Sequence, residues 1–499
     1  MTRRIRHNDT LRIACLSAFA VGVAGLLGLA SSHLVPVMVG TASCLPIFSY
    51  LRHTGWGRAV TEPTPATIII GFYILVIPAR ALVIAASGYT DVLQLPGAIS
   101  SKDMVPVLLL LSMGTTTLLE TYFFAASRSG RAERQARSSW SFEPLAPGLE
   151  RFAVLLAGLA LAGLGGVLVQ YGGLSAAQAA LATHAIAAAL QGNTTSSGSL
   201  WSIFAVPAVW ATACVAVNRA TNTGTRLAFA ATALVIVMAE LIVYGSRLNA
   251  LLALFGVWVM FHHSGRRVPL RAILLGLVVL VLISGPITSA RYETPQAGVP
   301  TLERYSRLAG YGVLDATLAV WHEPSQVRSQ LLSAQRWLDL PAYLVPSFLW
   351  RGRPNINQQR LGLFVADTIG TVNDKATGFP TTYMTEGWLI FGWPGVLLLS
   401  ILFGTAIGWA DRKLLGPLSD PRLAGVALLT YSFVVAGAFG YYKDGDLVAT
   451  FVGEVRTAAY LACLMLLSGA WGWRTRRSDP VAAESVHGEP SAYIHTVKL

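Results

Sequence analysis

The run LAFAATALVIVMAELIV (residues 227–243) is followed, after YGSR (244–247), by a second apolar run, LNALLALFGVWVMF (248–261). A helix needs about 20 mainly apolar residues to cross a bilayer, and each run approaches that length. The pair therefore predicts two membrane-spanning helices joined by a very short turn. Arg247 lies in this turn, and a charge inside or beside membrane spans usually has a partner or a function.

The composition of the whole chain agrees with a membrane protein. Of its 499 residues, 54% are hydrophobic and 12% are charged, and the mean hydropathy is +0.55. Soluble domains carry about 25% charged residues, so we expect an all-α polytopic integral membrane protein. The net charge of +12 does not indicate a nucleic-acid partner, because the basic residues are spread over short turns. The four cysteines lack CxxC spacing, which argues against a disulfide framework or a metal knuckle.

The apolar segments divide the chain along its length. We expect twelve spans, at 11–30, 33–51, 64–88, 104–126, 151–171, 200–218, 227–245, 248–263, 269–286, 384–410, 422–441 and 448–470. The first nine spans then occupy residues 1–286, a large loop with short helices occupies 287–383, and the last three spans occupy 384–473. The polar tail at 474–499 has no periodicity, and we expect it to be disordered.

Arginine and lysine in the short connections predict the orientation, since cytoplasmic loops of membrane proteins are enriched in both. Basic residues gather at the even-numbered boundaries if the N-terminus is cytoplasmic, as at Arg52, Arg58, Arg266 and Arg267. Both termini are therefore expected in the cytoplasm, in a multi-pass protein of the cytoplasmic (inner) membrane. The large loop is then extracytoplasmic.

Several ionisable residues fall inside spans, in the half that this topology places outward: Arg80, Glu240, Glu454 and Arg456. Each costs roughly 2.5 to 3.5 kcal/mol at a helix centre and less near the interface. Together with Arg247 they predict a polar cavity that opens outward. The alternative is structural, with Arg247 as a turn residue that reaches the interface and Glu240 as its partner.

The large loop adds a basic cluster in FLWRGRPNINQQR (348–360), where Arg351, Arg353 and Arg360 occur without any acidic residue; Lys375 follows. The planar guanidinium fork of arginine matches phosphate oxygens two at a time. An outward cavity ringed by such groups would suit a phosphate or diphosphate head group, and a solvated basic loop is the alternative. No nucleotide-loop, zinc-protease or serine-hydrolase motif competes in a fitting context, and the acidic residues are too sparse to predict a metal site.

Three sequence elements belong together. They are GSR (245–247) in the hairpin, RPN (353–355) in the large loop, and EGWLIFGWPG (386–395) at the entry to the next span. In this arrangement the chain resembles the Wzy-type oligosaccharide repeat-unit polymerases, which are related to the O-antigen ligases. The third element departs from the family pattern, because its first glycine follows the glutamate. The architecture covers nearly the whole chain, and the motifs cover about 245–265 and 345–400.

The resemblance implies a GT-C-like polymerase/ligase architecture and glycosyl transfer at the outer membrane face, without metal or cofactor. Donor and acceptor would be oligosaccharides on undecaprenyl diphosphate in the membrane lipid, and a chain-length regulator and a flippase would be partner proteins. Arg247 and Arg353 would stabilise the leaving diphosphate. The remaining substrate-binding set would be Arg80, Arg360, Arg351 and Lys375, supported by Glu240, Glu454 and Arg456.

A general base should accept the proton of the attacking hydroxyl. Glu386 is the first candidate, and Asp367 and Asp374 are the next. Glu386 could instead be a helix-start carboxylate that stabilises the positive end of the helix dipole. Two other functions stay open: a ligase that moves finished glycan to another acceptor, and a lipid-linked-oligosaccharide flippase or other transporter.

Overall fold

The computed structural model describes residues 35–54, 63–86, 101–127, 147–177, 196–218, 221–243, 247–263, 313–322, 340–345, 381–415 and 421–469. All regular secondary structure within these ranges is helical, with no strand. The predicted spans at 11–30 and 269–286, and the tail at 474–499, lie outside them.

Five helices are long and apolar enough to cross a membrane. They are α5 (Ser101–Ser127), α7 (Pro147–Gln170), α11 (Thr223–Ile242), α21 (Trp393–Leu415) and α23 (Leu447–Ser468). Shorter apolar stretches lie in α3 (Pro65–Val76) with α4 (Pro78–Ala86), in α10 (Ser196–Val217) and in α12 (Arg247–His263). The described part also contains α2 (Val35–Thr54) and α22 (Pro421–Asp444). The described residues therefore confirm a helical membrane protein, while the number of spans and their orientation stay predictions.

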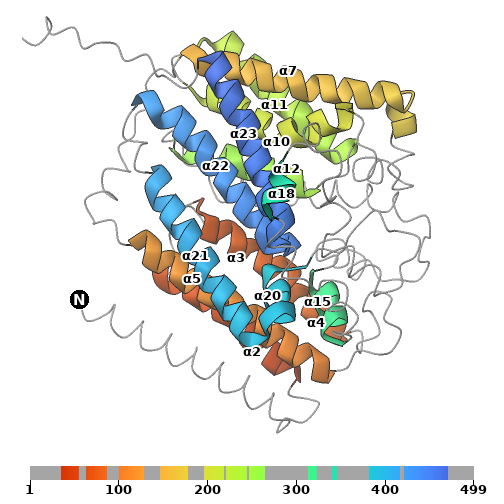
Figure 1. Cartoon of the computed structure of the whole chain (residues 1–499), viewed down its shortest axis with the longest axis vertical. Coiled ribbons are helices and arrows are strands. Elements are labelled where there is room, and N and C mark those ends of the chain that lie inside the picture. Colours follow the sequence, from red (N-terminus) through yellow and green to blue (C-terminus); the bar gives the residue numbers. More distant parts are fainter. Residues whose placement is uncertain are drawn as a thin grey trace, which may run out of the picture.

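Figure 1 shows how the long helices are arranged. The helices α21, α22 and α23 pack in that order, α5 lies along α21, and α7 packs against both α10 and α23. Two of the expected spans are each divided into two helices.

The span expected at 384–410 is two helices, α20 (Tyr383–Phe391) and α21, separated at Gly392. Gly392 has φ +67° and ψ −151°, a positive-φ conformation that ends α20 and that glycine adopts without a Cβ penalty. The backbones of the two helices lie very close together at this point. A Cβ added at Gly395 would lie only 2.2 Å from the carbonyl oxygen of Gly387. The glycines of EGWLIFGWPG therefore form a tight bend between two helices.

The span expected at 64–88 is also interrupted. Helix α3 ends at Val76, Ile77 is a turn residue, and α4 begins at Pro78. Proline has no backbone N–H to continue the helix and is well suited to the first turn of a new one. This break places Arg80 in the first turn of α4.

Buried apolar side chains of the described residues form two large cores. The first core gathers α7, α10, α11 and α12, and the second gathers α2 to α5 with α20 and α21. Helix α22 belongs to both, since Leu428 and Val435 lie in the first core, and Tyr441 and Tyr442 lie in the second.

Two short helices come from the segment expected to be the large loop: α15 (Val313–His322) and α18 (Leu340–Leu344). Leu314 and Leu318 of α15 are buried in the second core, whereas Tyr343 of α18 packs against Val448 and Val452 of α23. Both described helices of this segment are therefore attached to the bundle.

Candidate functional site

The start of α20 is a junction between the bundle and α15. Thr382 caps α20, because its side chain accepts a hydrogen bond from the backbone N–H of Thr385. The hydroxyl oxygen of Thr385 lies 3.0 Å from that of Thr317 in α15. One turn further along each helix, Trp388 stacks on Trp321 with 4.6 Å between ring centroids. The helix that carries Glu386 is thus fixed against a helix of the 287–383 segment.

Glu386 is buried at this junction, with 1% of its surface exposed. Its Oε2 accepts a 3.0 Å hydrogen bond from the backbone N–H of Leu447, the first residue of α23. The first N–H groups of a helix have no partner inside it, and a carboxylate there also interacts favourably with the positive end of the helix dipole. Glu386 therefore caps α23, which is a more specific role than stabilising the start of its own helix.

The turn between α22 and α23 lies in close contact with the same junction. Gly445 has φ +58°, and a Cβ there would lie 2.3 Å from the carbonyl oxygen of Thr382 and 2.4 Å from that of Thr381. Only a residue without a side chain fits this approach. The start of α20, the turn at 445–446 and the start of α23 are consequently held together.

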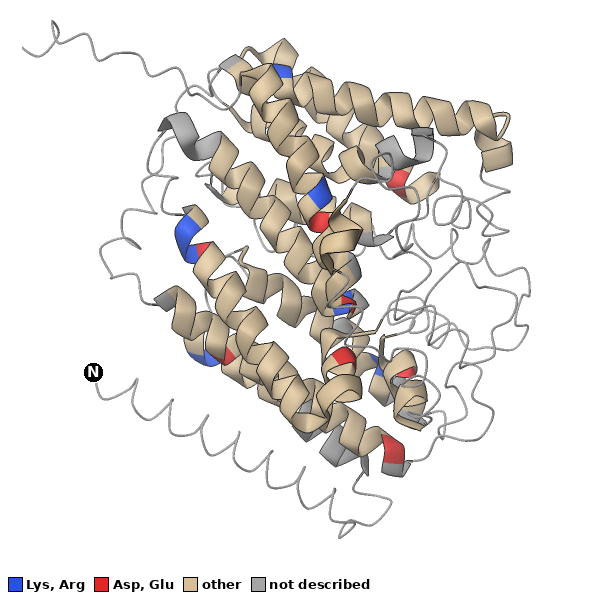
Figure 2. Ribbon diagram, in the orientation of Figure 1, with Lys and Arg blue, Asp and Glu red and all other residues tan. Residues whose placement is uncertain are grey.

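Arg80 lies beside this junction in a buried ion pair. Its Nε and Nη2 donate to the two carboxylate oxygens of Asp315 in α15, at 3.1 and 2.9 Å, and both residues are 1% exposed. Such a bidentate pair, with two parallel N–H···O hydrogen bonds, is stronger than a single arginine–carboxylate hydrogen bond. Figure 2 shows that charged residues are sparse along the described helices, and that some acidic residues lie next to basic ones.

Asp315 is the partner of Arg80 that the sequence did not lead us to predict. A signal was available, since VLDATLAV (313–320) places one acidic residue inside an apolar helix-length run. The expectation that Arg80 contacts a diphosphate stays a prediction, but its guanidinium is already bound by Asp315 and attaches α15 to the bundle.

Hydroxyl groups form a polar layer through the second core. The hydroxyl groups of Tyr73 and Ser112 form a hydrogen bond with 2.8 Å between their oxygens, and those of Thr115 and Tyr442 do the same at 2.8 Å. The Tyr383 hydroxyl lies 2.9 Å from the Ser400 hydroxyl and donates to the Gly114 carbonyl at 3.3 Å. Each of these side chains is buried. Paired hydroxyls of this kind lower the cost of polar groups in a membrane interior.

The hairpin between α11 and α12 lies in the other core. Arg247 is the first residue of α12, and its side chain is outside the described part. Glu240 is buried, and its Oε2 accepts a 3.3 Å hydrogen bond from Asn249, which bridges the two helices. Helix α12 packs on α10, α11 and α22, whereas α4 packs on α2 and α3. Arg80 and the start of α12 therefore belong to different cores.

Glu454 and Arg456 lie in the first half of α23, seven and nine residues after Leu447. Glu454 packs over Gly437 of α22, where an added Cβ would come within 2.8 Å of the Glu454 Cδ. Arg456 donates from Nη2 to the backbone carbonyl oxygen of Tyr343 in α18. Arg456 is thus a second attachment between the bundle and the 287–383 segment.

The other predicted site residues, Arg351, Arg353, Arg360, Asp367, Asp374 and Lys375, lie outside the described residues. Within the described ranges, no group of three or more His, Cys, Asp or Glu side chains is placed to hold a metal ion. No family model, curated protein or solved structure matches this chain. Among the described side chains, Glu386 combines burial, a carboxyl group and a position where the 287–383 segment rejoins the bundle.

Proposed function

We propose that this chain is a membrane glycosyltransferase that polymerises oligosaccharide repeat units linked to undecaprenyl diphosphate. It would cross the cytoplasmic membrane twelve times with both termini in the cytoplasm, and would act at the outer face through the 287–383 segment. The proposal starts from the sequence resemblance to Wzy-type polymerases.

One structural observation supports it most. The motif glutamate Glu386 is buried where α20 follows the 287–383 segment, beside α15 and the start of α23. The proposed reaction at the mouth of the bundle needs a proton acceptor beside the substrate-binding segment, and the position of this carboxyl supports that role.

The proposed reaction transfers the growing glycan to the next repeat unit. The acceptor hydroxyl attacks the anomeric carbon of the donor, the bond from that carbon to the diphosphate oxygen breaks, and Glu386 takes the hydroxyl proton. Arg247 and Arg353 would stabilise the charge that develops on the leaving diphosphate. Arg360, Arg351 and Lys375 would bind the rest of the lipid-linked substrate, and Asp367 and Asp374 are the other base candidates.

The first test examines the surface polysaccharide of a host that lacks the gene. We expect products of a single repeat, which the unaltered gene extends again into a ladder. Arg247→Ala and Arg353→Ala should insert into the membrane normally and leave the product at one repeat, because the diphosphate loses its stabilising charges. Arg151→Ala removes an exposed arginine at the start of α7 and should restore the ladder.

Two other products would support the alternative functions. Lipid-linked polymer that accumulates without transfer would identify a ligase, and lipid-linked repeat units trapped on the cytoplasmic face would identify a flippase. A normal ladder from either arginine variant would contradict the proposed diphosphate role.

The Glu386→Gln variant separates the proposed base from the capping role. The amide oxygen of glutamine can still accept the hydrogen bond from the Leu447 N–H, so we expect folding to be preserved. Glutamine cannot take the hydroxyl proton, so polymer formation should fall by about 10²- to 10⁴-fold. Chain-length analysis at matched protein levels measures this, and a full-length ladder would eliminate Glu386 as the base.

A further inference from the structure

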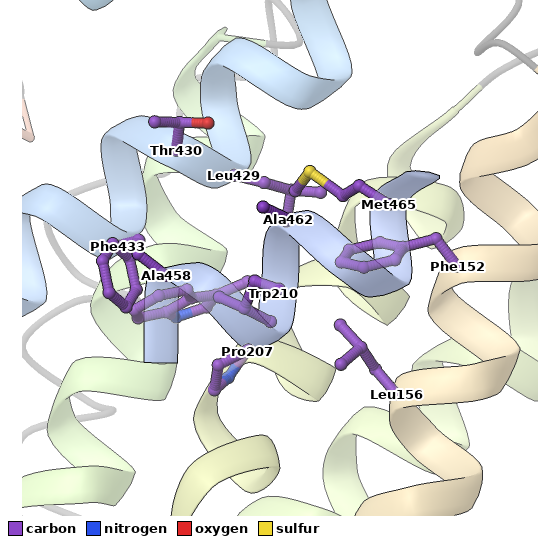
Figure 3. A pocket seen from close by; sticks show the side chains of 11 residues that line it. Phe152, Leu156, Pro207, Trp210, Leu429, Thr430, Phe433, Ala458, Ala462 and Met465 are labelled. Carbon is purple, nitrogen blue, oxygen red and sulfur yellow. The ribbon is translucent and has the colours of Figure 1, made fainter. Parts of the chain in front are cut away.

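The helices α22 and α23 leave an apolar cavity between them, with a volume of about 190 Å³. Its floor is formed by Phe152 and Leu156 of α7 and Trp210 of α10, all buried. Phe433 of α22 and Ala458 of α23 line it nearer its exposed side. In Figure 3 the side chains of these helices point into a common space.

The side chains that line the cavity are almost entirely apolar. Thr430 is the only lining residue with a hydroxyl, and that hydroxyl donates to the Val426 carbonyl of its own helix at 2.9 Å. The indole N–H of Trp210 donates to the Leu252 carbonyl at 3.2 Å. An apolar cavity of about 150 Å³ already stays dry and holds a benzene-sized molecule. In a membrane, the available hydrocarbon is a lipid chain.

The same seam between α22 and α23 carries a carboxyl group at one end. Glu454 precedes Ala458 by four residues, and Gly437 follows Phe433 by four residues, so each pair lies on one helix face. The Glu454 side chain rests on Gly437 and is partly exposed. The polar group is therefore about one helical turn from the apolar lining.

The length of the seam fits one lipid. Glu454 and Met465, the last lining residue on α23, are eleven residues apart, or roughly 16 Å along the helix. A hydrocarbon core of about 30 Å gives each leaflet a chain length of about 15 Å. A head group at Glu454 would thus place its chain along the whole cavity.

We propose that the α22–α23 seam binds a membrane lipid with an ammonium head group, as in phosphatidylethanolamine. The ammonium donates to the Glu454 carboxyl, and one acyl chain fills the cavity as far as Met465. A lipid with an anionic head and no ammonium has no charge to offer this carboxylate, so the seam selects between the two. This lipid site does not require the proposed glycosyl transfer to be correct, since the lipid retained on the protein is measured without any reaction.

The test uses the full chain in vesicles of equal parts phosphatidylethanolamine and phosphatidylglycerol. After extraction with surrounding lipid, mass spectrometry counts each lipid retained per protein. We expect phosphatidylethanolamine to be enriched on the parent protein, and Glu454→Gln to reduce this enrichment by roughly tenfold through loss of one charge-assisted hydrogen bond. The Gln variant should still retain total lipid, because the apolar cavity is unchanged.

Ala458→Phe should block the cavity and lower the total retained lipid. Ala459→Phe is the matched control, because Ala459 is exposed on the neighbouring face and does not line the cavity. Equal enrichment in the parent, Glu454→Gln and Ala458→Phe would overturn the proposal. It would also be overturned if Ala458→Phe broke a dimer without changing lipid retention, since a second copy of the chain would then occupy the seam.

Discussion

Arg80→Ala is expected to destabilise the folded protein by about 3 to 5 kcal/mol, the usual cost of leaving one charge of a buried pair unpaired. Asp315 would lose both hydrogen bonds to the guanidinium while 99% of its surface stays covered. Helix α15 would lose its bidentate attachment to α4. We expect earlier thermal unfolding in detergent and cleavage by added protease near α15.

The control replaces both charges with apolar side chains of similar size. Arg80→Met with Asp315→Leu should recover most of the lost stability, because apolar substitutes for a buried ion pair are often neutral or stabilising. Equal stability of the parent and Arg80→Ala would show that the pair contributes nothing. The folded double variant also tests the catalytic prediction for Arg80: loss of polymer would support contact with the diphosphate, and a normal ladder would leave Arg80 with the structural role alone.

Gly395→Ala is expected to be the second severe change, at about 1 to 3 kcal/mol or more from overpacking. The added methyl would lie 2.2 Å from the Gly387 carbonyl oxygen and 2.8 Å from Cβ of Phe391. Backbone cannot move aside as a flexible side chain can, so the bend between α20 and α21 must open. Because α20 carries Glu386, polymer formation should fall together with thermal stability.

Gly158→Ala provides the matched control within α7. A Cβ at Gly158 meets nothing within 4 Å. Alanine is favoured over glycine in a helix by up to about 1 kcal/mol, so this change should leave stability equal or higher. If Gly395→Ala behaves like Gly158→Ala, the two helices do not pack as closely as the glycines require.

The sequence predicts the class of protein well because that prediction depends on short-range composition. Runs such as 151–171 and 227–245 are close in length to the bilayer core, and α7 (to Gln170) and α11 (to Ile242) form helices over their described residues. The prediction fails where a run of uniform hydrophobicity hides a break, as at Ile77 and Gly392. Average hydropathy does not register a single proline or a glycine with positive φ.

The candidate site was predictable only in part. The motif predicts Glu386, and the structure shows it buried beside the start of α23, while its role as a base stays a prediction. Its partner, the N–H of Leu447, is 61 residues away and could not be inferred from a pattern. The predicted cavity that unites Arg80, Arg247 and the 348–360 cluster is still a prediction, because most of those groups lie outside the described residues.

The sequence by itself determined that this chain is a helical membrane protein, since a span needs only about 20 consecutive apolar residues. It also marked the few charges that a membrane interior makes costly. Only the tertiary structure decided how those charges are compensated: Arg80 by Asp315, 235 residues away, and Arg456 by the Tyr343 carbonyl. Pairing in a low-dielectric interior depends on which helices pack together, and that packing joins segments that are distant along the chain.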